Sequence, residues 1–226
     1  AVTWTFTCDG VPVDVPSHVI AASGTTKGQT WVVEVVASDG EWTSDPFGAS
    51  VLIRNTRPVA TFASISPEAP TTDDDLVLQV AGQDADGDVL SWRIEWSVDG
   101  RPATEFDGSL TIPAAETARS EVWSASVRPF DGEDAGDPLV TDVRVDNTVP
   151  VIGSVRVIPY DPTVDESICA VLEDVADEDG DEVTVTLEWT LDGVTVQTDV
   201  LDPGDTGTCL AAPRHNGQTI QATATP

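Results

Sequence analysis

Residues 84–100, DADGDVLSWRIEWSVDG, recur 93 positions later as residues 177–193, DEDGDEVTVTLEWTLDG. In the first copy Trp92, Ile94 and Trp96 alternate with polar residues, as expected of a strand that buries one face. Both copies close on Asp-Gly, a pair that tolerates the positive φ of a tight hairpin turn. The stretch therefore predicts an acidic loop, then a half-buried strand, then a hairpin.

Further landmarks return at nearly the same interval on both sides of this stretch. Asn-Thr-x-Pro stands at 55–58 and again at 147–150, and Trp31 with Asp39-Gly40 returns as Trp123 with Asp131-Gly132. Self-similarity at a fixed interval indicates tandem copies of one structural unit. The sequence therefore predicts a repeat of about 92 residues in three segments: 1–56 without its N-terminal strands, a complete 57–148, and 149–226 truncated at its C-terminus.

Shorter alternating runs predict the remaining strands. They lie at 2–8, 76–80, 123–127 and 183–191, and no stretch has a convincing helical period; residues 113–121 offer at most one helical turn. Short strands with turn signals roughly every 8–12 residues are typical of a two-sheet sandwich. We expect an all-β chain in which each Asn-Thr-x-Pro is a stiff linker, since Pro fixes φ.

Composition excludes several classes of protein. The 226 residues carry 40 Asp and Glu against 10 Lys and Arg, a net charge of -30, which disfavours nucleic acid as a partner. Seven Trp and 40% apolar residues still allow packed cores, and no apolar run is long enough to span a membrane.

There is no Met. We expect an excerpt of a longer array; the alternative is that neighbouring subunits supply the missing strands.

The order of these motifs resembles the immunoglobulin-like (PKD- or cadherin-like) tandem repeats of large secreted bacterial surface proteins. The resemblance implies the fold class of tandem immunoglobulin-like β-sandwich repeats and an extracellular or cell-surface location. It also implies that the main partners are neighbouring repeats of the same or identical chains, with surface glycans or proteins as further candidates. Calcium is the cofactor that it implies at the acidic loops.

Three carboxylates at alternate positions around a Gly can converge on one hard cation. The two Asp-x-Asp-Gly-Asp loops and the second linker supply the candidate calcium ligands: Asp84, Asp86, Asp88, Asp146, Asp177, Asp179 and Asp181. An EF-hand is rejected because the Gly stands at the fourth position of the loop and not the sixth. At the first junction Arg54 and Arg57 offer a salt bridge in place of metal. The alternative throughout is that these loops are solvated turns whose Asp side chains cap backbone N–H groups.

The three Cys divide into a candidate pair and a single thiol. In an immunoglobulin-like sheet the strands that carry Cys169 and Cys209 are neighbours, so a cross-strand disulfide is favoured over two buried thiols. Cys8 aligns with the inward Val98 and Leu191 and is predicted to be a buried free thiol.

The tryptophans are assigned mainly to packing. Trp96 and Trp189, with Phe6 at the matching position, are predicted core residues. Trp42 lies instead in a turn-rich loop, where an exposed indole would contact a neighbouring domain or stack on a sugar; the domain contact is favoured.

No catalytic arrangement is recognisable. The only His residues, His18 and His215, stand in different segments without a nucleophile motif, and there is no phosphate loop, HExxH or CxxC. We therefore predict a non-enzymatic structural or adhesive spacer of an extracellular cell-surface or fibre-forming protein. The alternatives are a carbohydrate-binding module and an accessory region of a secreted hydrolase.

Overall fold

The computed structural model describes residues 1–226 apart from 17, 212–214 and 216, and the described chain is built from β-strands. Its helical elements are three short 3-10 turns, η1 (Ala22–Gly24), η2 (Thr104–Phe106) and η3 (Ala114–Glu116), the last inside the stretch for which one turn was predicted. In the described residues no helix is long and apolar enough to cross a membrane. The strands are β1 (Val2–Cys8), β2 (Val11–Val13), β3 (Thr30–Ala37), β4 (Phe47–Leu52), β5 (Val59–Ser66), β6 (Leu76–Gln83), β7 (Ser91–Val98), β8 (Arg101–Pro102), β9 (Thr111–Ile112), β10 (Val122–Phe130), β11 (Leu139–Arg144), β12 (Val151–Ile158), β13 (Cys169–Ala176), β14 (Val185–Leu191), β15 (Val194–Leu201), β16 (Gly207–Cys209) and β17 (Ile220–Thr225).

The chain forms two compact units. Unit 1 comprises Ala1–Ile65, Leu78–Leu110 and Ser124–Asp142, and unit 2 comprises Ser66–Val77, Thr111–Trp123 and Val143–Pro226. Strands β5, β6, β10 and β11 run from one unit into the other. Each sheet draws its strands from only one of the segments 1–56, 57–148 and 149–226, here called the first, second and third segments. Their boundaries as domains stay a prediction.

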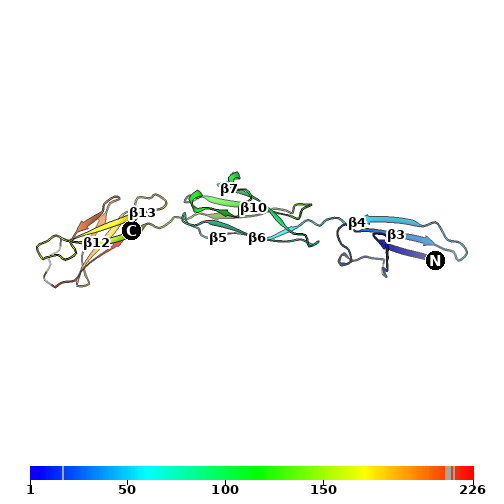
Figure 1. Ribbon diagram of the computed structural model, residues 1–226, viewed down its shortest axis with the longest axis horizontal. Coiled ribbons are helices and arrows are strands. Elements are labelled where there is room, and N and C mark those ends of the chain that lie inside the picture. The colour runs from blue at the N-terminus through cyan, green and yellow to red at the C-terminus, as the bar shows by residue number, and fades with distance from the viewer. Residues whose placement is uncertain (17, 212–214, 216) are drawn as a thin grey trace. The chain divides into compact units, whose positions relative to one another are not determined.

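The first segment forms one four-stranded sheet in the order β2-β1-β3-β4, with β3 and β4 side by side in Figure 1. Trp31 is buried, but Trp4 on the neighbouring strand remains 47% exposed. The described residues of this segment contain no second sheet to cover that face. The predictions for Phe6 and Cys8 were therefore too strong: both are half-buried, because burial in a sandwich needs an opposing layer.

The second segment contains two sheets, β5-β6-β9 and β11-β10-β7-β8. Its first, second and fifth strands form one sheet, and its third, fourth, sixth and seventh form the other. Within unit 1, β5 and β6 lie in one layer of Figure 1 and β7 and β10 in the next. Leu78 of the first sheet and Ile94, Trp96 and Val127 of the second are all buried, which confirms the predicted core position of Trp96.

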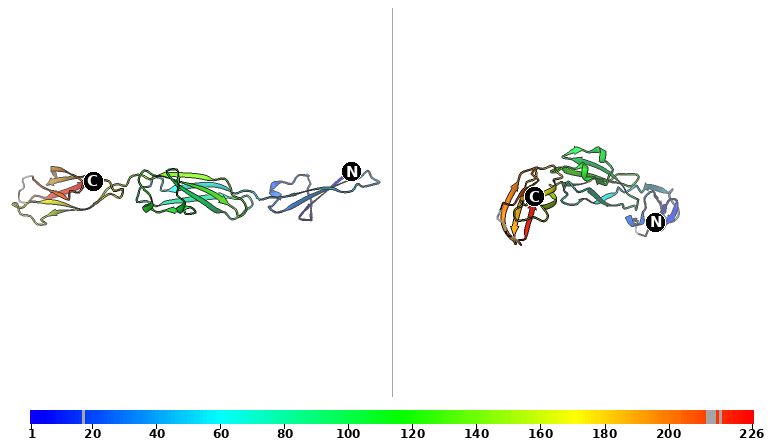
Figure 2. Two further views of the ribbon diagram at one scale, coloured as in Figure 1. Left: turned by 90° about the horizontal axis from the view of Figure 1, so that it is seen from above. Right: turned by 60° about the vertical axis from the view of Figure 1, so that its left-hand side comes forward.

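The third segment is a two-sheet sandwich within unit 2. Its sheets are β12-β13-β16 and β15-β14-β17, seen in two further orientations in Figure 2. One core cluster joins Ala170 and Leu172 of β13 to Leu187 and Trp189 of β14, so apolar residues from both sheets meet between them. The predicted sandwich and the core position of Trp189 are confirmed here.

The hairpin prediction is confirmed by backbone geometry. Asp9-Gly10, Asp99-Gly100 and Asp192-Gly193 each connect two paired strands, and all six residues have positive φ, between 48° and 81°. Two successive left-handed residues match the twist of the strands that they join, and Asp-Gly tolerates them at low cost.

Candidate functional site

The Asp-x-Asp-Gly-Asp loop of the second segment folds around its first carboxylate. Asp84 Oδ1 accepts the backbone N–H groups of Asp86, at 2.8 Å, and of Asp88, at 3.2 Å, while Gly87 takes a φ of +81°. The other oxygen, Asp84 Oδ2, is buried and has no hydrogen-bond partner among the described residues. The loop is thus locally capped, and Asp86 and Asp88 are left to contact other parts of unit 1.

The second Asp of each loop binds the linker. In unit 1 the backbone N–H of Thr56 donates to Asp86 Oδ2 at 2.7 Å. In unit 2 the backbone N–H of Thr148 donates to Asp179 Oδ2, also at 2.7 Å. Asn-Thr-x-Pro and Asp-x-Asp-Gly-Asp are therefore two halves of one contact, which explains why the two motifs recur together.

The third Asp of each loop binds a basic side chain. Lys27 Nζ forms an ion pair with Asp88 and a 3.0 Å hydrogen bond to Asn55 Oδ1 of the linker. Arg119, 92 positions later, forms an ion pair with Asp181 and donates to Asn147 Oδ1 at 2.6 Å. We call each set a junction clamp. The first is Lys27, Asn55, Thr56, Asp86 and Asp88, and the second is Arg119, Asn147, Thr148, Asp179 and Asp181.

Local folding places the basic residue beside the linker. In unit 1, Gly28 and Gln29 pair with Ile53 through two backbone hydrogen bonds of 2.9 Å, so Lys27 lies next to the start of the linker. In unit 2, Ser120 and Glu121 pair with Val145 in the same way, at 2.8 and 2.9 Å, and place Arg119. The expected salt bridges of Arg54 and Arg57 were wrong: within the described residues neither forms one, since Lys27 comes from the adjacent turn.

The first clamp has additional acidic partners from the loop that follows β10. Asn55 Nδ2 donates to Asp131 Oδ2 at 2.8 Å and to Asp134 Oδ2 at 3.2 Å, and Lys27 lies 3.4 Å from Glu133 Oε2. The hydrogen bond from Asn55 lowers the pKa of Asp131 to about 2, despite some desolvation. The hydrogen bond to Asp88 raises the pKa of Lys27. Both groups are therefore charged over a wide pH range.

The second clamp uses hydroxyl groups instead. Thr148 is buried, and its Oγ1 lies 2.7 Å from Thr72 Oγ1 and accepts the backbone N–H of Thr72 at 3.1 Å. Thr72 Oγ1 is also 2.8 Å from Asp179 Oδ1. Both oxygens of Asp179 thus have protein partners. The neighbouring Asp74 and Asp75 cap backbone N–H groups at Thr71 and Ala114.

The predicted calcium ligands fall into different environments. Asp84, Asp86 and Asp88 offer oxygens that all lie within 4.8 Å of one another, the one such acidic group in the described residues. In the other loop Asp177 Oδ1 caps the N–H of Asp181, and Asp179 and Asp181 belong to the second clamp. Asp146 donates its backbone N–H to Pro70 O at 2.7 Å. Metal binding by any of them stays a prediction.

Sequence reasoning did not find Lys27 and Arg119. With only 10 basic residues in the chain, two that stand 92 positions apart, each before a core strand, were an available signal. Their partners lie at separations of 61 and 62 residues, which no local pattern links to them.

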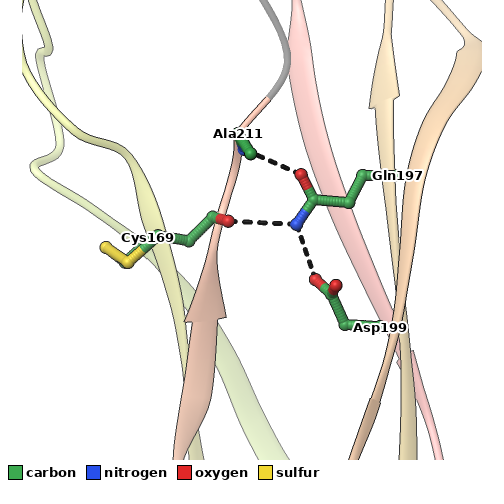
Figure 3. Close-up of a disulfide and its surroundings, with 5 residues drawn as sticks. Cys169, Gln197, Asp199 and Ala211 are labelled. Carbon is green, nitrogen blue, oxygen red and sulfur yellow. Dashed lines mark hydrogen bonds between the residues drawn. A yellow bond between two sulfur atoms is a disulfide. The ribbon is translucent and has the colours of Figure 1, made fainter.

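Cys169 and Cys209 are joined by a disulfide between directly paired residues of β13 and β16. Their Cα atoms are 3.9 Å apart, closer than the separation expected from the sequence. Figure 3 shows Gln197 of β15 beside this bond, donating to Asp199 and to the carbonyl of Cys209 and accepting the N–H of Ala211. The side chain of Gln197 therefore ties β15, in one sheet, to β16, in the other.

Trp42 lies in the loop between β3 and β4 and is 76% exposed. Asp39 Oδ1 holds this loop by accepting the N–H groups of Glu41 and Trp42, and these backbone hydrogen bonds lower the pKa of Asp39. The indole contact predicted from the sequence, with a domain or a sugar, stays a prediction.

No protein-family model and no curated protein matches the chain. Among solved structures the chain is similar to the FN1–FN3 domains of chicken CNTN1, with a TM-score of 0.33 and 12% identity over 100% of this chain and 83% of that one. It is also similar to a Ca²⁺-stabilized adhesin that helps an Antarctic bacterium reach out and bind ice, with a TM-score of 0.30 and 15% identity over 99% of this chain and 63% of that one. At this level of similarity, the chain's own contacts remain the basis for interpreting the junctions.

Proposed function

We propose that the chain is a non-catalytic structural and adhesive spacer of an extracellular cell-surface or fibre-forming protein. The observation that carries the proposal is the junction clamp, which recurs at both linkers with the same Asp and Asn acceptor atoms and a basic side chain in each. In each clamp the linker is fixed to the acidic loop of the segment that follows. Repeating this contact gives an array of segments length and direction.

The clamp restrains the linker by three independent kinds of contact. The Thr N–H is held by an Asp, the Asn side chain is held by a cation, and the following Pro, Pro58 or Pro150, fixes one dihedral angle. Exposed ion pairs contribute only about 0–1 kcal/mol each. We therefore attribute the restraint to the whole set of contacts and expect the less exposed first clamp to be the stronger one.

Small-angle X-ray scattering of the full chain tests this function. Replacing both cations, Lys27→Met with Arg119→Met, should broaden the distribution of interatomic distances, because both linkers gain freedom. A matched control, Arg101→Met with Arg128→Met, removes the same charge from exposed strand positions. If the two double variants scatter alike, the clamp does not restrain the linkers and the spacer proposal loses its basis.

We further propose that calcium binds at Asp84, Asp86 and Asp88. Their convergent oxygens, together with the buried and unpartnered Asp84 Oδ2, favour a hard cation at this loop. Lys27 already neutralises Asp88, so calcium would share or displace that partner. At the second loop the protein donors on Asp179 and Asp181 leave fewer free oxygens, and we expect weaker binding there, with Asp146 and Asp177 as the remaining candidates.

Thermal unfolding with and without 1 mM calcium, at constant ionic strength, tests the metal. Calcium that binds only the folded chain should raise the melting temperature, and a chelator should reverse the shift. Asp84→Asn should abolish most of the shift, while Asp177→Asn should leave most of it. If calcium does not change the melting temperature, the proposed metal site is wrong, while the spacer proposal is unaffected.

The exposure of Trp42 gives carbohydrate binding a specific residue to test. A glycan array probed with the full chain and with Trp42→Ala distinguishes the two functions. A specific sugar whose binding is lost in the variant would favour a carbohydrate-binding module over a spacer.

A further inference from the structure

Each carboxylate of Asp84, Asp86 and Asp88, here called the first acidic loop, keeps one oxygen free of protein hydrogen bonds. Asp84 Oδ1 accepts two backbone N–H groups of the loop, and its Oδ2 is buried without a partner among the described residues. Asp86 Oδ2 accepts the N–H of Thr56, and Asp88 Oδ2 binds Lys27 Nζ. In the part of the chain that the structure describes, the Oδ1 atoms of Asp86 and Asp88 have no protein partner. This donor set of hard oxygens fits calcium.

One of these carboxylates already binds a cation that belongs to the chain. Lys27 Nζ forms an ion pair with Asp88 Oδ2, donates to Asn55 Oδ1 at 3.0 Å and lies 3.4 Å from Glu133 Oε2. The side chains of Lys27 and Asp88 are only 28% and 30% exposed, so water screens their charges in part. The hydrogen bond to Asp88 raises the pKa of Lys27, which keeps the ammonium group charged. All of these residues belong to unit 1.

A calcium ion bound to Asp88 would bring two cations onto one carboxylate. Like charges a few ångströms apart repel each other strongly where screening is incomplete. The coupling is reciprocal, because a group that weakens calcium binding is itself bound less tightly when calcium is present. Glu133 offers Lys27 a second acidic partner, so the ammonium group can leave Asp88 without losing its counter-charge.

The second junction does not offer the same choice. Asp179 has protein partners on both of its oxygens, the N–H of Thr148 and the hydroxyl of Thr72. Its ion pair joins Arg119 to Asp181, for which no second acidic partner of Arg119 lies within ion-pair distance among the described residues. The competition is therefore expected at the first junction.

We propose that Lys27 is a tethered cation that competes with calcium for Asp88 and so sets the calcium concentration at which the first acidic loop fills. Without calcium, the ammonium group occupies Asp88 and holds Asn55 of the linker. With calcium, Lys27 moves from Asp88 to Glu133, while the N–H of Thr56 keeps its contact with the loop. The inference rests on the proposed calcium site and concerns how that site is regulated.

Isothermal titration calorimetry of the full chain with calcium chloride tests the competition. Lys27→Met should bind calcium at least about ten-fold more tightly than the unchanged chain, because the competing charge is removed and most of the side-chain stem is kept. Arg101→Met removes the same charge at the opposite end of β7 from the loop and should change the affinity less than about two-fold. Slow hydrogen exchange of the β7 amides verifies that each variant is folded.

The outcomes of this titration separate the inference from the site on which it rests. Equal affinities of the Lys27 and Arg101 variants would overturn the competition and leave the metal site in place. No calcium binding by any of the three chains would overturn the metal site and the competition together. Asp84→Asn added to Lys27→Met should abolish the tight binding, and tight binding that persists would place calcium elsewhere and overturn the inference.

Amine labelling reports the position of Lys27 directly, because Lys27 is the only lysine in the chain. Acetic anhydride should modify its ε-amine at least several-fold faster when calcium saturates the site, since the partner that raises its pKa is lost. The α-amine of Ala1, resolved by peptide mass spectrometry, is the internal reference and should react at a constant rate. The amide of Thr56 should stay protected from hydrogen exchange in both states. A labelling rate of Lys27 that calcium leaves unchanged or lowers, or a Thr56 amide that calcium exposes, would overturn the inference.

Discussion

At the scale of single residues, the two core tryptophans Trp96 and Trp189 differ in one hydrogen bond. Trp96 Nε1 donates to Ser109 O at 3.0 Å, whereas Trp189 Nε1 is buried with no acceptor among the described residues. A buried donor without a partner loses its hydration without compensation. The two equivalent positions in the fold therefore differ in whether the indole N–H has a hydrogen-bond acceptor.

We predict that Trp96→Phe destabilises its segment more than Trp189→Phe does, by about 1 kcal/mol. Both changes lose similar apolar area, but only the first leaves a carbonyl without its donor, while the second removes an unpaired N–H. Hydrogen exchange of the β7 and β14 amides measures the two losses separately. Equal losses, or a greater loss at Trp189, would contradict the assignment.

Asp131 is expected to make the first junction sensitive to acid. Its folded pKa is about 2, below the ordinary value of 3.8, so its contribution is complete above the ordinary value and is lost as pH falls through about 2. The hydrogen bond from Asn55 is the largest cause of this lowered pKa.

Asn55→Ala should therefore raise the pKa of Asp131 toward its ordinary value, measured by NMR titration of the side-chain carboxyl. Asp39, whose pKa is lowered by backbone N–H groups of its own loop, is the internal reference and should not move. A pKa of Asp131 unchanged by the substitution would show that Asn55 is not its main partner.

At the scale of the elements, the disulfide connects β13 and β16 across 40 residues of chain. Closing a loop of this length in the unfolded state stabilises the folded one by roughly 2–4 kcal/mol. Gln197 adds a second tie between β15 and β16 at the same place. Because β16 has only three residues, we expect its place in the fold to depend on these two cross-links.

Replacing Cys169 and Cys209 together by Ala should destabilise the third segment by roughly 2–4 kcal/mol, as measured by urea unfolding. Cys8→Ala serves as the control. It removes a half-buried thiol, and its effect should be confined to the first segment. Unfolding of the third segment at the same urea concentration with and without the bond would refute the prediction.

At the scale of the whole molecule, a net charge of -30 dominates the electrostatics. Self-repulsion destabilises a compact chain, and salt screens it over about 10 Å at 0.1 M. Four ion pairs in the described residues are few against 40 acidic side chains.

The melting temperature should therefore rise as sodium chloride is increased from 20 to 500 mM, well beyond the small loss from weakened ion pairs. Potassium chloride at the same concentrations should give the same rise, because the effect is one of screening. A melting temperature that falls with salt would mean that the clamps outweigh the repulsion.

The sequence by itself determined the alternating strands β1, β6, β7, β10 and β14, the Asp-Gly hairpins, the core positions of Trp96 and Trp189 and the internal period of the chain. These features follow from alternation and turn chemistry, which act between residues close along the chain. The sequence also located the acidic loops and the linkers, but it did not indicate that each loop contacts a linker. Only the tertiary structure decided that Lys27 and Arg119 complete the junctions and that Cys8 is half-buried. The roles of these basic residues and the burial of the thiol depend on which residues, distant in the sequence, lie beside them in the fold. Neither a local period nor a spacing motif encodes such contacts.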